Sequence, residues 1–74
     1  MESSVTNQHN LTRARVLAVI YAYCAKHTIG PSQQEIARAV GCSDHTVRRC
    51  LVELVETAPI WYIPGMVRGI GVMQ

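Results

Sequence analysis

The residues best suited to recognition chemistry lie together between Asp44 and Arg49. Arg48 and Arg49 are neighbours, and each guanidinium group can bond bidentately to guanine or to a phosphate. His45 can donate or accept a hydrogen bond at a base edge, and Thr46 can reach a phosphate. Asp44 would repel phosphate, although it can accept a hydrogen bond from the amino group of cytosine. This set of groups predicts contacts to duplex DNA.

These side chains need an element that presents them, and residues 33–52 have the pattern of a helix, a tight turn and a second helix. Ala37 falls where two helices would approach closely, and Gly41 falls at the turn, where glycine adopts a positive φ without strain. Val47 follows where the second helix would pack back on the first. The remaining inward positions are Ile36, Val40, Cys42, Cys50 and Leu51. Further along the second helix, Leu54 and Val55 are also predicted to lie inward. A helix delivered in this way can lie in a major groove.

Residues that can cap a helix precede both of these helices. Ser32 and Glu35 form an S-x-x-E capping box at the first, and Ser43 is placed to cap the second, the recognition helix over 43–57. The start of the first helix, at Ser32 and Gln33, has free backbone amides that suit a phosphate. We therefore include Ser32, Gln33 and Ser43 among the predicted DNA contacts.

An additional helix is expected ahead of this motif. Leu11 and Thr12 indicate a helix entry, with Thr12 as the cap and Leu11 packing onto Val16. The helix should run to about residue 27, and Ile29 is expected to form a very short strand after it. The inward stripe of this helix is predicted to be Val16, Leu17, Ile20 and Cys24.

The C-terminal segment has the pattern of a β-hairpin over residues 60–73. Pro64-Gly65 is the preferred pair for the centre of a type II turn, and β-prone runs lie on both sides of it. Ile70 and Val72 should share one face of the second strand. Arg68 is expected to reach the DNA backbone or the adjacent minor groove.

Helices near 12–27, 33–41 and 44–57, followed by a hairpin, are the order of a winged helix-turn-helix, in which the hairpin is the wing. The predicted fold class is therefore mostly α, with three helices and a small β-hairpin. Residues 1–10 are polar and lack periodicity, which predicts a flexible N-terminal tail ahead of one domain over 11–74.

The chain resembles the DNA-binding domain of LexA-type repressors over this whole domain. The segments that carry the resemblance are Leu11-Thr12-Arg13, Gly30-Pro31-Ser32 through Ala37, and Gly65 through Arg68-Gly69-Ile70. The chain departs from the family between Gly41 and Leu51, where LexA-type domains have one extra residue, and it lacks their protease domain. The resemblance implies a winged-helix fold and a DNA-facing surface, but not the self-cleaving mechanism.

One side of the first predicted helix is unusually apolar. No charged residue occurs between Arg15 and Lys26, and a helix that is apolar on all sides is normally covered on all sides. We expect a partner contact centred on Ala18, Tyr21 and Ala22, which a second copy of the chain could provide. The alternative is that the alanines serve only helix propensity.

Composition excludes several classes of function. The net charge of +2 is modest for a nucleic-acid binder, so any basic surface must be local. The spacing of Cys42, His45 and Cys50 lacks a fourth zinc ligand, and we expect these residues and Cys24 to be reduced and metal-free. No catalytic constellation is present, so neither an enzyme nor a cofactor is expected. No signal peptide or membrane-spanning run is evident, which predicts the cytoplasm of a bacterial host cell.

Two functional interpretations follow. The first is a small stand-alone transcription regulator that binds double-stranded DNA, as a dimer if it is to be specific. The second is a winged-helix protein that regulates transcription by binding a protein of the transcription machinery, such as RNA polymerase, because fold does not fix function. Steep weakening of DNA binding by salt would favour the first.

Overall fold

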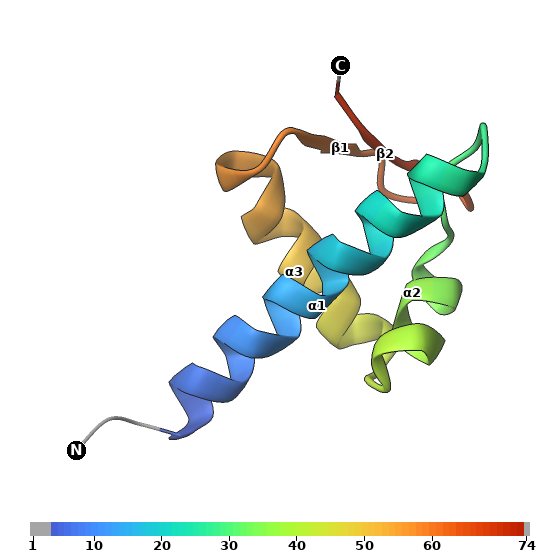
Figure 1. Cartoon of the computed structure of the whole chain (residues 1–74). Coiled ribbons are helices and arrows are strands. Elements are labelled where there is room, and N and C mark those ends of the chain that lie inside the picture. The colour runs from blue at the N-terminus through green and yellow to red at the C-terminus, as the bar shows by residue number, and fades with distance from the viewer. Residues whose placement is uncertain (1–3, 74) are drawn as a thin grey trace.

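The computed structural model describes residues 4–73, and side chains are described from His9 onward. Its elements are α1 (Ser4–Lys26), α2 (Gln33–Val40), α3 (Asp44–Thr57), β1 (Ile60–Tyr62) and β2 (Ile70–Val72). The two strands form an antiparallel pair in which Trp61 lies opposite Gly71 (Figure 1). The predicted fold class, three helices followed by a small β-hairpin, is confirmed.

The helix-turn-helix has the predicted local geometry. Ser32 Oγ accepts a hydrogen bond from the backbone amide of Glu35 at 3.1 Å, and Glu35 Oε1 accepts one from the amide of Ser32 at 2.9 Å, which completes the capping box. Gly41 ends α2 with φ 85°, in the left-handed region that glycine tolerates best. Ser43 Oγ caps α3 by accepting from the amide of Thr46 at 3.2 Å. These caps fix the direction in which α3 leaves the turn.

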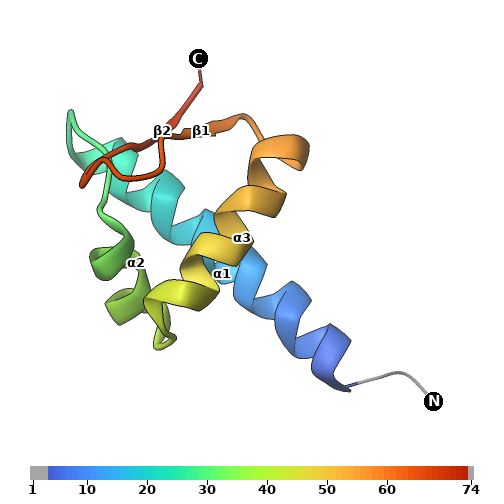
Figure 2. The ribbon, with the colours of Figure 1, turned by 180° about the vertical axis from the view of Figure 1, so that it is seen from behind.

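The core lies where the three helices and the hairpin meet. α1 passes across α2 and α3, and the hairpin closes the end of the core near the C-terminal turns of α1 and α3 (Figures 1 and 2). The predicted inward residues Val40 and Cys42 are half-buried, and the others in the motif are buried. The buried apolar residues are Val16, Ile20, Ile36, Ala37, Val47, Cys50, Leu51, Leu54, Ile60 and Ile70.

The start of α1 differs from the prediction. The helix begins at Ser4 rather than near Thr12, so residues 4–10, which we expected to be a flexible tail, are helical; residues 1–3 lie outside the described part. A tertiary contact that the local pattern does not reveal accompanies this earlier start. His9 Nε2 lies 2.9 Å from Glu53 Oε1 of α3, and Arg13 donates to the same oxygen at 2.7 Å. The N-terminal end of α1 protrudes beyond the rest of the molecule (Figure 1).

Three smaller predictions were wrong. Leu11 was expected to precede the helix and pack onto Val16, yet it is 53% exposed. The helix continues through Leu11, so this residue does not stand ahead of a helix start. Val55 had been expected inside, yet it is exposed, since in the last turns of α3 the buried side is occupied by Leu51 and Leu54. Ile29 forms no strand and is 54% exposed. None of these differences changes the orientation of α3.

The loop of the hairpin, Ile63–Gly69, consists of two successive turns. The carbonyl of Ile63 accepts from the amide of Met66 at 3.3 Å, and the carbonyl of Met66 accepts from Gly69 at 3.2 Å. Gly65 has φ 85°, as the third residue of the predicted type II turn requires. A further bond from the amide of Ile63 to the carbonyl of Gly69, at 2.7 Å, closes the loop. We call this loop the wing tip.

Candidate nucleic-acid interface

One side of α3 presents most of the predicted recognition residues to solvent. Asp44, His45, Arg48 and Arg49 are exposed, and Val52 is 54% exposed one turn further on. The opposite side of the helix is buried in the core. This arrangement follows from the helical repeat of 3.6 residues, which separates the buried positions from the polar ones. The helix therefore presents its polar side outward along most of its length.

The hydroxyl groups of Thr46 and of the two capping serines already form hydrogen bonds within the chain. Thr46 is half-buried, and its Oγ1 lies 3.0 Å from Ser43 Oγ, so the two hydroxyls are hydrogen-bonded to each other. Ser32 Oγ and Ser43 Oγ each accept from a backbone amide as helix caps. Each of these groups stabilises a helix start, and any contact to a ligand is additional to that role.

Two of the carboxylates are engaged in ion pairs within the chain, so most of the unpaired charged groups in the described part are cations. Glu35 is paired with Arg68, and Glu53 with Arg13 and His9. The hydrogen bonds from His9 and Arg13 lower the pKa of Glu53. In the described part of the chain, the cations outside any ion pair are Arg15, Lys26, Arg38, Arg48 and Arg49. The corresponding carboxylates are Asp44 and Glu56.

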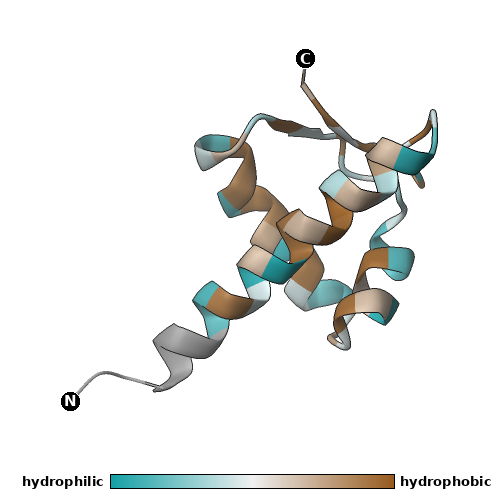
Figure 3. Ribbon diagram, viewed as in Figure 1, coloured by the Kyte–Doolittle hydropathy of each residue, from teal (hydrophilic) through white to brown (hydrophobic). Residues whose placement is uncertain are grey.

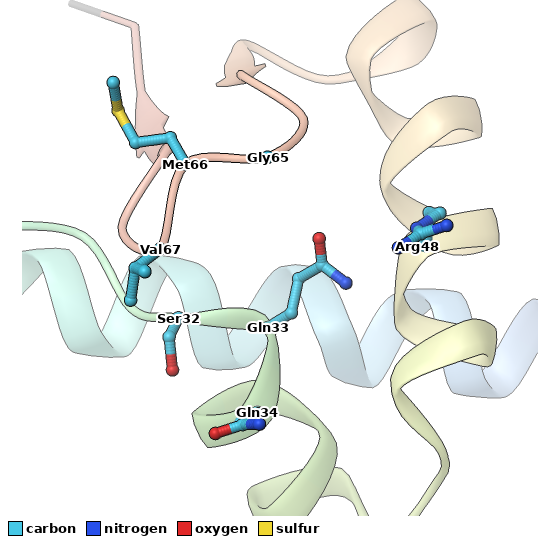
Figure 4. A pocket seen from close by; sticks show the side chains of 7 residues that line it. All are labelled: Ser32, Gln33, Gln34, Arg48, Gly65, Met66 and Val67. Carbon is cyan, nitrogen blue, oxygen red and sulfur yellow. The ribbon is translucent and has the colours of Figure 1, made fainter.

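The start of α2, the middle of α3 and the wing tip surround a hollow of about 270 Å³. Figure 4 shows Gln33 extending from the start of α2 toward α3, on the side where Arg48 lies. The lining residues are Ser32, Gln33, Gln34, Arg48, Gly65, Met66 and Val67. The fold thus brings together three predicted contact residues, Ser32 and Gln33 at the start of α2 and Arg48 on α3. It adds Met66 and Val67 of the wing tip, which were not among the predicted DNA contacts.

The side chain of Gln33 is oriented by a residue that sequence reasoning missed. Tyr62 Oη donates a hydrogen bond to Gln33 Oε1 at 2.8 Å, across 29 positions in the sequence. Because the amide oxygen is engaged, the amide nitrogen remains as a donor at the hollow. Arg48 has only donors. The hollow is therefore matched to hydrogen-bond acceptors such as phosphate oxygens or purine N7 and O6 atoms.

Arg68 does not project from the wing as predicted. Its guanidinium donates to Glu35 Oε1 at 2.8 Å and Oε2 at 3.2 Å, to the carbonyl of Gly30 at 3.0 Å and to Tyr23 Oη at 3.1 Å. The bond from Arg68 is the main cause that lowers the pKa of Glu35 to about 2, and the backbone bond from Ser32 adds to it. The guanidinium of Arg68 is thus engaged within the chain, and a contact between Arg68 and DNA stays a prediction that would be additional to these bonds.

With Arg68 turned inward, the wing tip is apolar. Val67 is 76% exposed, Met66 is 56% exposed and Ile63 is 47% exposed. No other charged residue occurs between Ala58 and Met73. The sequence pattern predicted a hairpin over residues 60–73. It did not predict that the apolar side chains of the loop would be exposed.

The predicted partner surface on α1 faces solvent. Ala18 and Ala22 are exposed, and Tyr21 is 40% exposed. Figure 3 shows apolar residues on both the outward and the inward sides of the middle of this helix. No described part of the chain packs over the three residues, so their contact with a partner stays a prediction.

The cysteines occupy apolar positions. Cys50 is buried, Cys24 and Cys42 are half-buried, and all three are free thiols. Burial raises the pKa of the Cys42 and Cys50 thiols, which favours the less reactive protonated form. Within residues 4–73, no three His, Cys, Asp or Glu side chains are grouped to hold a metal ion.

Comparison with known proteins adds no assignment. No protein-family model matches the chain, and no characterised protein matches it significantly in sequence. None of the described helices combines the length and the apolar content that crossing a bilayer requires. The function must therefore be argued from the geometry of the site.

Proposed function

We propose that the chain is a small transcription regulator that binds duplex DNA, with α3 as the recognition helix, in the manner of LexA-like winged-helix domains. The observation that supports this most is the row of exposed groups on α3 beside the hollow. Arg48 and Gln33 contribute donors from two helices to one concave surface. DNA presents acceptors in the major groove and on both flanking backbones, and this surface is complementary to them.

The residues take different roles in such a complex. Arg48, one turn after Asp44, faces the groove floor and bonds to a guanine, while Arg49 lies about 100° around the helix and meets the backbone. His45 and Asp44 read base edges at the start of α3. Gln33, held by Tyr62, donates to a phosphate at the start of α2, where the free backbone amides also favour an anion.

Salt-dependent binding tests this proposal. Fluorescence anisotropy should detect binding to a random duplex that weakens steeply as salt rises, and tighter binding to the region upstream of the protein's own coding sequence, because small repressors often bind there. Replacement of Lys26 at the end of α1 by alanine is a control that removes one exposed, unpaired cation from outside the helix-turn-helix. Absence of salt-dependent DNA binding would refute the proposal.

We further propose that two copies associate through α1 when they bind DNA, because one domain of this size makes few base contacts. An antiparallel pairing centred on Ala18 would set Arg15 of one copy beside Tyr21 of the other, where a cation–π contact can form. No carboxylate lies on this part of α1 to disturb the pairing.

Sedimentation of Ala22→Glu tests the association. The variant should remain folded and sediment as a monomer at concentrations where the wild type forms dimers. Ala39→Glu, which changes an exposed alanine on α2, should leave the dimer intact. A wild-type protein that stays monomeric at every concentration, with and without DNA, would rule out this interface.

A second function is favoured by the apolar wing tip. Met66 and Val67 could dock on a protein of the transcription machinery such as RNA polymerase, and Asp44 on α3 would then not be opposed by phosphate. Retention on immobilised polymerase, combined with little retention on heparin or duplex DNA, would favour this function over DNA binding.

A further inference from the structure

The wing tip presents its apolar side chains on a restrained backbone. Two turns and the closing bond between Ile63 and Gly69 hold the loop, and Arg68 anchors it to Glu35, Gly30 and Tyr23. Met66 and Val67 project from this frame with most of their surface exposed. The loop therefore meets a ligand in a nearly fixed conformation, which reduces the ordering cost of binding.

The tip is continuous with the proposed DNA surface. Met66 and Val67 line the same hollow as Arg48 and Gln33 (Figure 4). A duplex bound against α3 would consequently run past the wing tip. Because the tip has no free cation, it cannot hold DNA by pairing with phosphates.

We propose that Met66 and Val67 act as an apolar wedge in the DNA minor groove beside the major groove that α3 occupies. Apolar side chains in the minor groove partly unstack a base step and bend the duplex. The inference rests on the proposed DNA-binding function and adds a second source of specificity. The wing selects sequences by how easily they deform, and flexible TA or CA steps at the wing position are favoured over stiff A-tracts.

The positions of the charged groups favour DNA over a protein as the occupant. The exposed arginines Arg38, Arg48 and Arg49 lie on the two helices of the motif, where the unpaired carboxylates are Asp44 and Glu56. Cations therefore outnumber carboxylates among the unpaired groups of these helices. A polyanion satisfies these cations and reaches the tip at the same time. A purely apolar protein surface would satisfy the tip but leave the cations unpaired.

The test measures bending and flank preference together. Energy transfer between dyes at the ends of a short duplex should report a bend with the wild type. The double variant Met66→Ala with Val67→Ala should remove the bend and lose about tenfold in affinity for a TA-flanked site, the order expected for one unfavourable base step. Its affinity for an A-tract-flanked site should change little. Met73→Ala is the control, since Met73 is also exposed but follows β2 at the end away from the wing tip.

A second variant keeps the test independent of lost contact area. Compared with the double alanine variant, Val67→Lys should bind all duplexes more tightly at low salt. It should still show no preference for TA-flanked sites. A bend or a TA preference that survives in the double alanine variant would overturn the wedge but leave DNA binding intact. Loss of polymerase binding in that variant, with unchanged DNA binding, would also overturn it and assign the tip to a protein contact. Failure of the wild type to bind any duplex would instead refute the proposed function itself.

Discussion

Arg48, which lines a hollow together with the wing tip, and Arg68, which belongs to the wing tip, occupy opposite environments. Arg48 is exposed on α3 and has no ion-pair partner in the described part of the chain, while Arg68 donates to three residues of α1, α2 and the segment between them. Both had been predicted to contact DNA. The difference shows that an arginine beside the proposed DNA surface can stabilise the fold instead of remaining unpaired at the surface. The two roles predict different consequences when each residue is changed.

The largest effect is expected from the double variant Arg48→Ala with Arg49→Ala. Loss of one base contact and one backbone contact should weaken binding to the specific site by a hundredfold or more, since a bidentate base contact alone contributes roughly 1–3 kcal/mol. The melting temperature should be unchanged because both side chains are exposed. Anisotropy titration and thermal denaturation measure the two quantities. Unchanged DNA affinity would mean that Arg48 and Arg49 do not contact DNA, and it would favour the protein-docking function.

Arg68→Ala should have the opposite profile and reduce stability first. The folded pKa of Glu35 is about 2, below its ordinary value of 4.5. The ion pair therefore stabilises the fold fully above pH 4.5, and this contribution is lost as the pH falls toward 2. The melting temperatures of wild type and variant should differ most at pH 7, and the difference should shrink toward pH 2, where only the bonds of Arg68 to Gly30 and Tyr23 remain. A constant difference across this range would show that Glu35 is not the partner that matters.

The single arginine variants sharpen the comparison within α3. Arg48→Ala should cost roughly 1–3 kcal/mol on the specific site and relax specificity at one base. Arg49→Ala should weaken all duplexes alike and reduce the slope of log affinity against log salt by about one. Identical behaviour of the two variants would mean that both arginines contact only the backbone. Titrations at several salt concentrations on specific and random duplexes distinguish these outcomes.

The smallest expected effect belongs to Tyr62→Phe, which removes only the hydroxyl that orients Gln33. The fold should persist, because Tyr62 is half-buried and the ring remains. Freeing the Gln33 amide should reduce DNA affinity a few-fold, in line with the roughly 0.5–1.5 kcal/mol net value of one hydrogen bond. If the double variant is weaker than Gln33→Ala by the same factor that separates Tyr62→Phe from the wild type, Tyr62 acts independently of Gln33.

The features that the sequence predicted correctly depend on neighbours along the chain. The capping box joins Ser32 and Glu35 across three positions, and Gly41 needs only its own φ. Helical and strand periods likewise place Val47 or Ile70 inside from local pattern alone. The order of helices and hairpin followed from these signals.

The features that were missed depend on contacts between distant segments. Arg68 pairs with Glu35 across 33 positions, and Tyr62 with Gln33 across 29. His9 meets Glu53 across 44 positions, and this contact accompanies the early start of α1. Such pairings depend on how elements pack, which a single sequence does not encode in any local pattern. The exposure of Met66 and Val67 likewise depends on how the loop folds against the rest of the chain, which the run of apolar residues alone does not reveal.

Glu35 has one consequence for the motion of the molecule. Its Oε1 accepts both from the backbone amide of Ser32, which begins α2, and from the guanidinium of Arg68 in the wing. Release of the wing breaks the bond between Arg68 and Glu35, and this weakens the position of Glu35 in the capping box of α2. Fraying of the first turn of α2 likewise weakens the bond that holds the wing. The two segments should open as one cooperative unit, with amide hydrogens at the start of α2 and in the wing exchanging at matched rates. The concave surface is thus kept or lost as a whole.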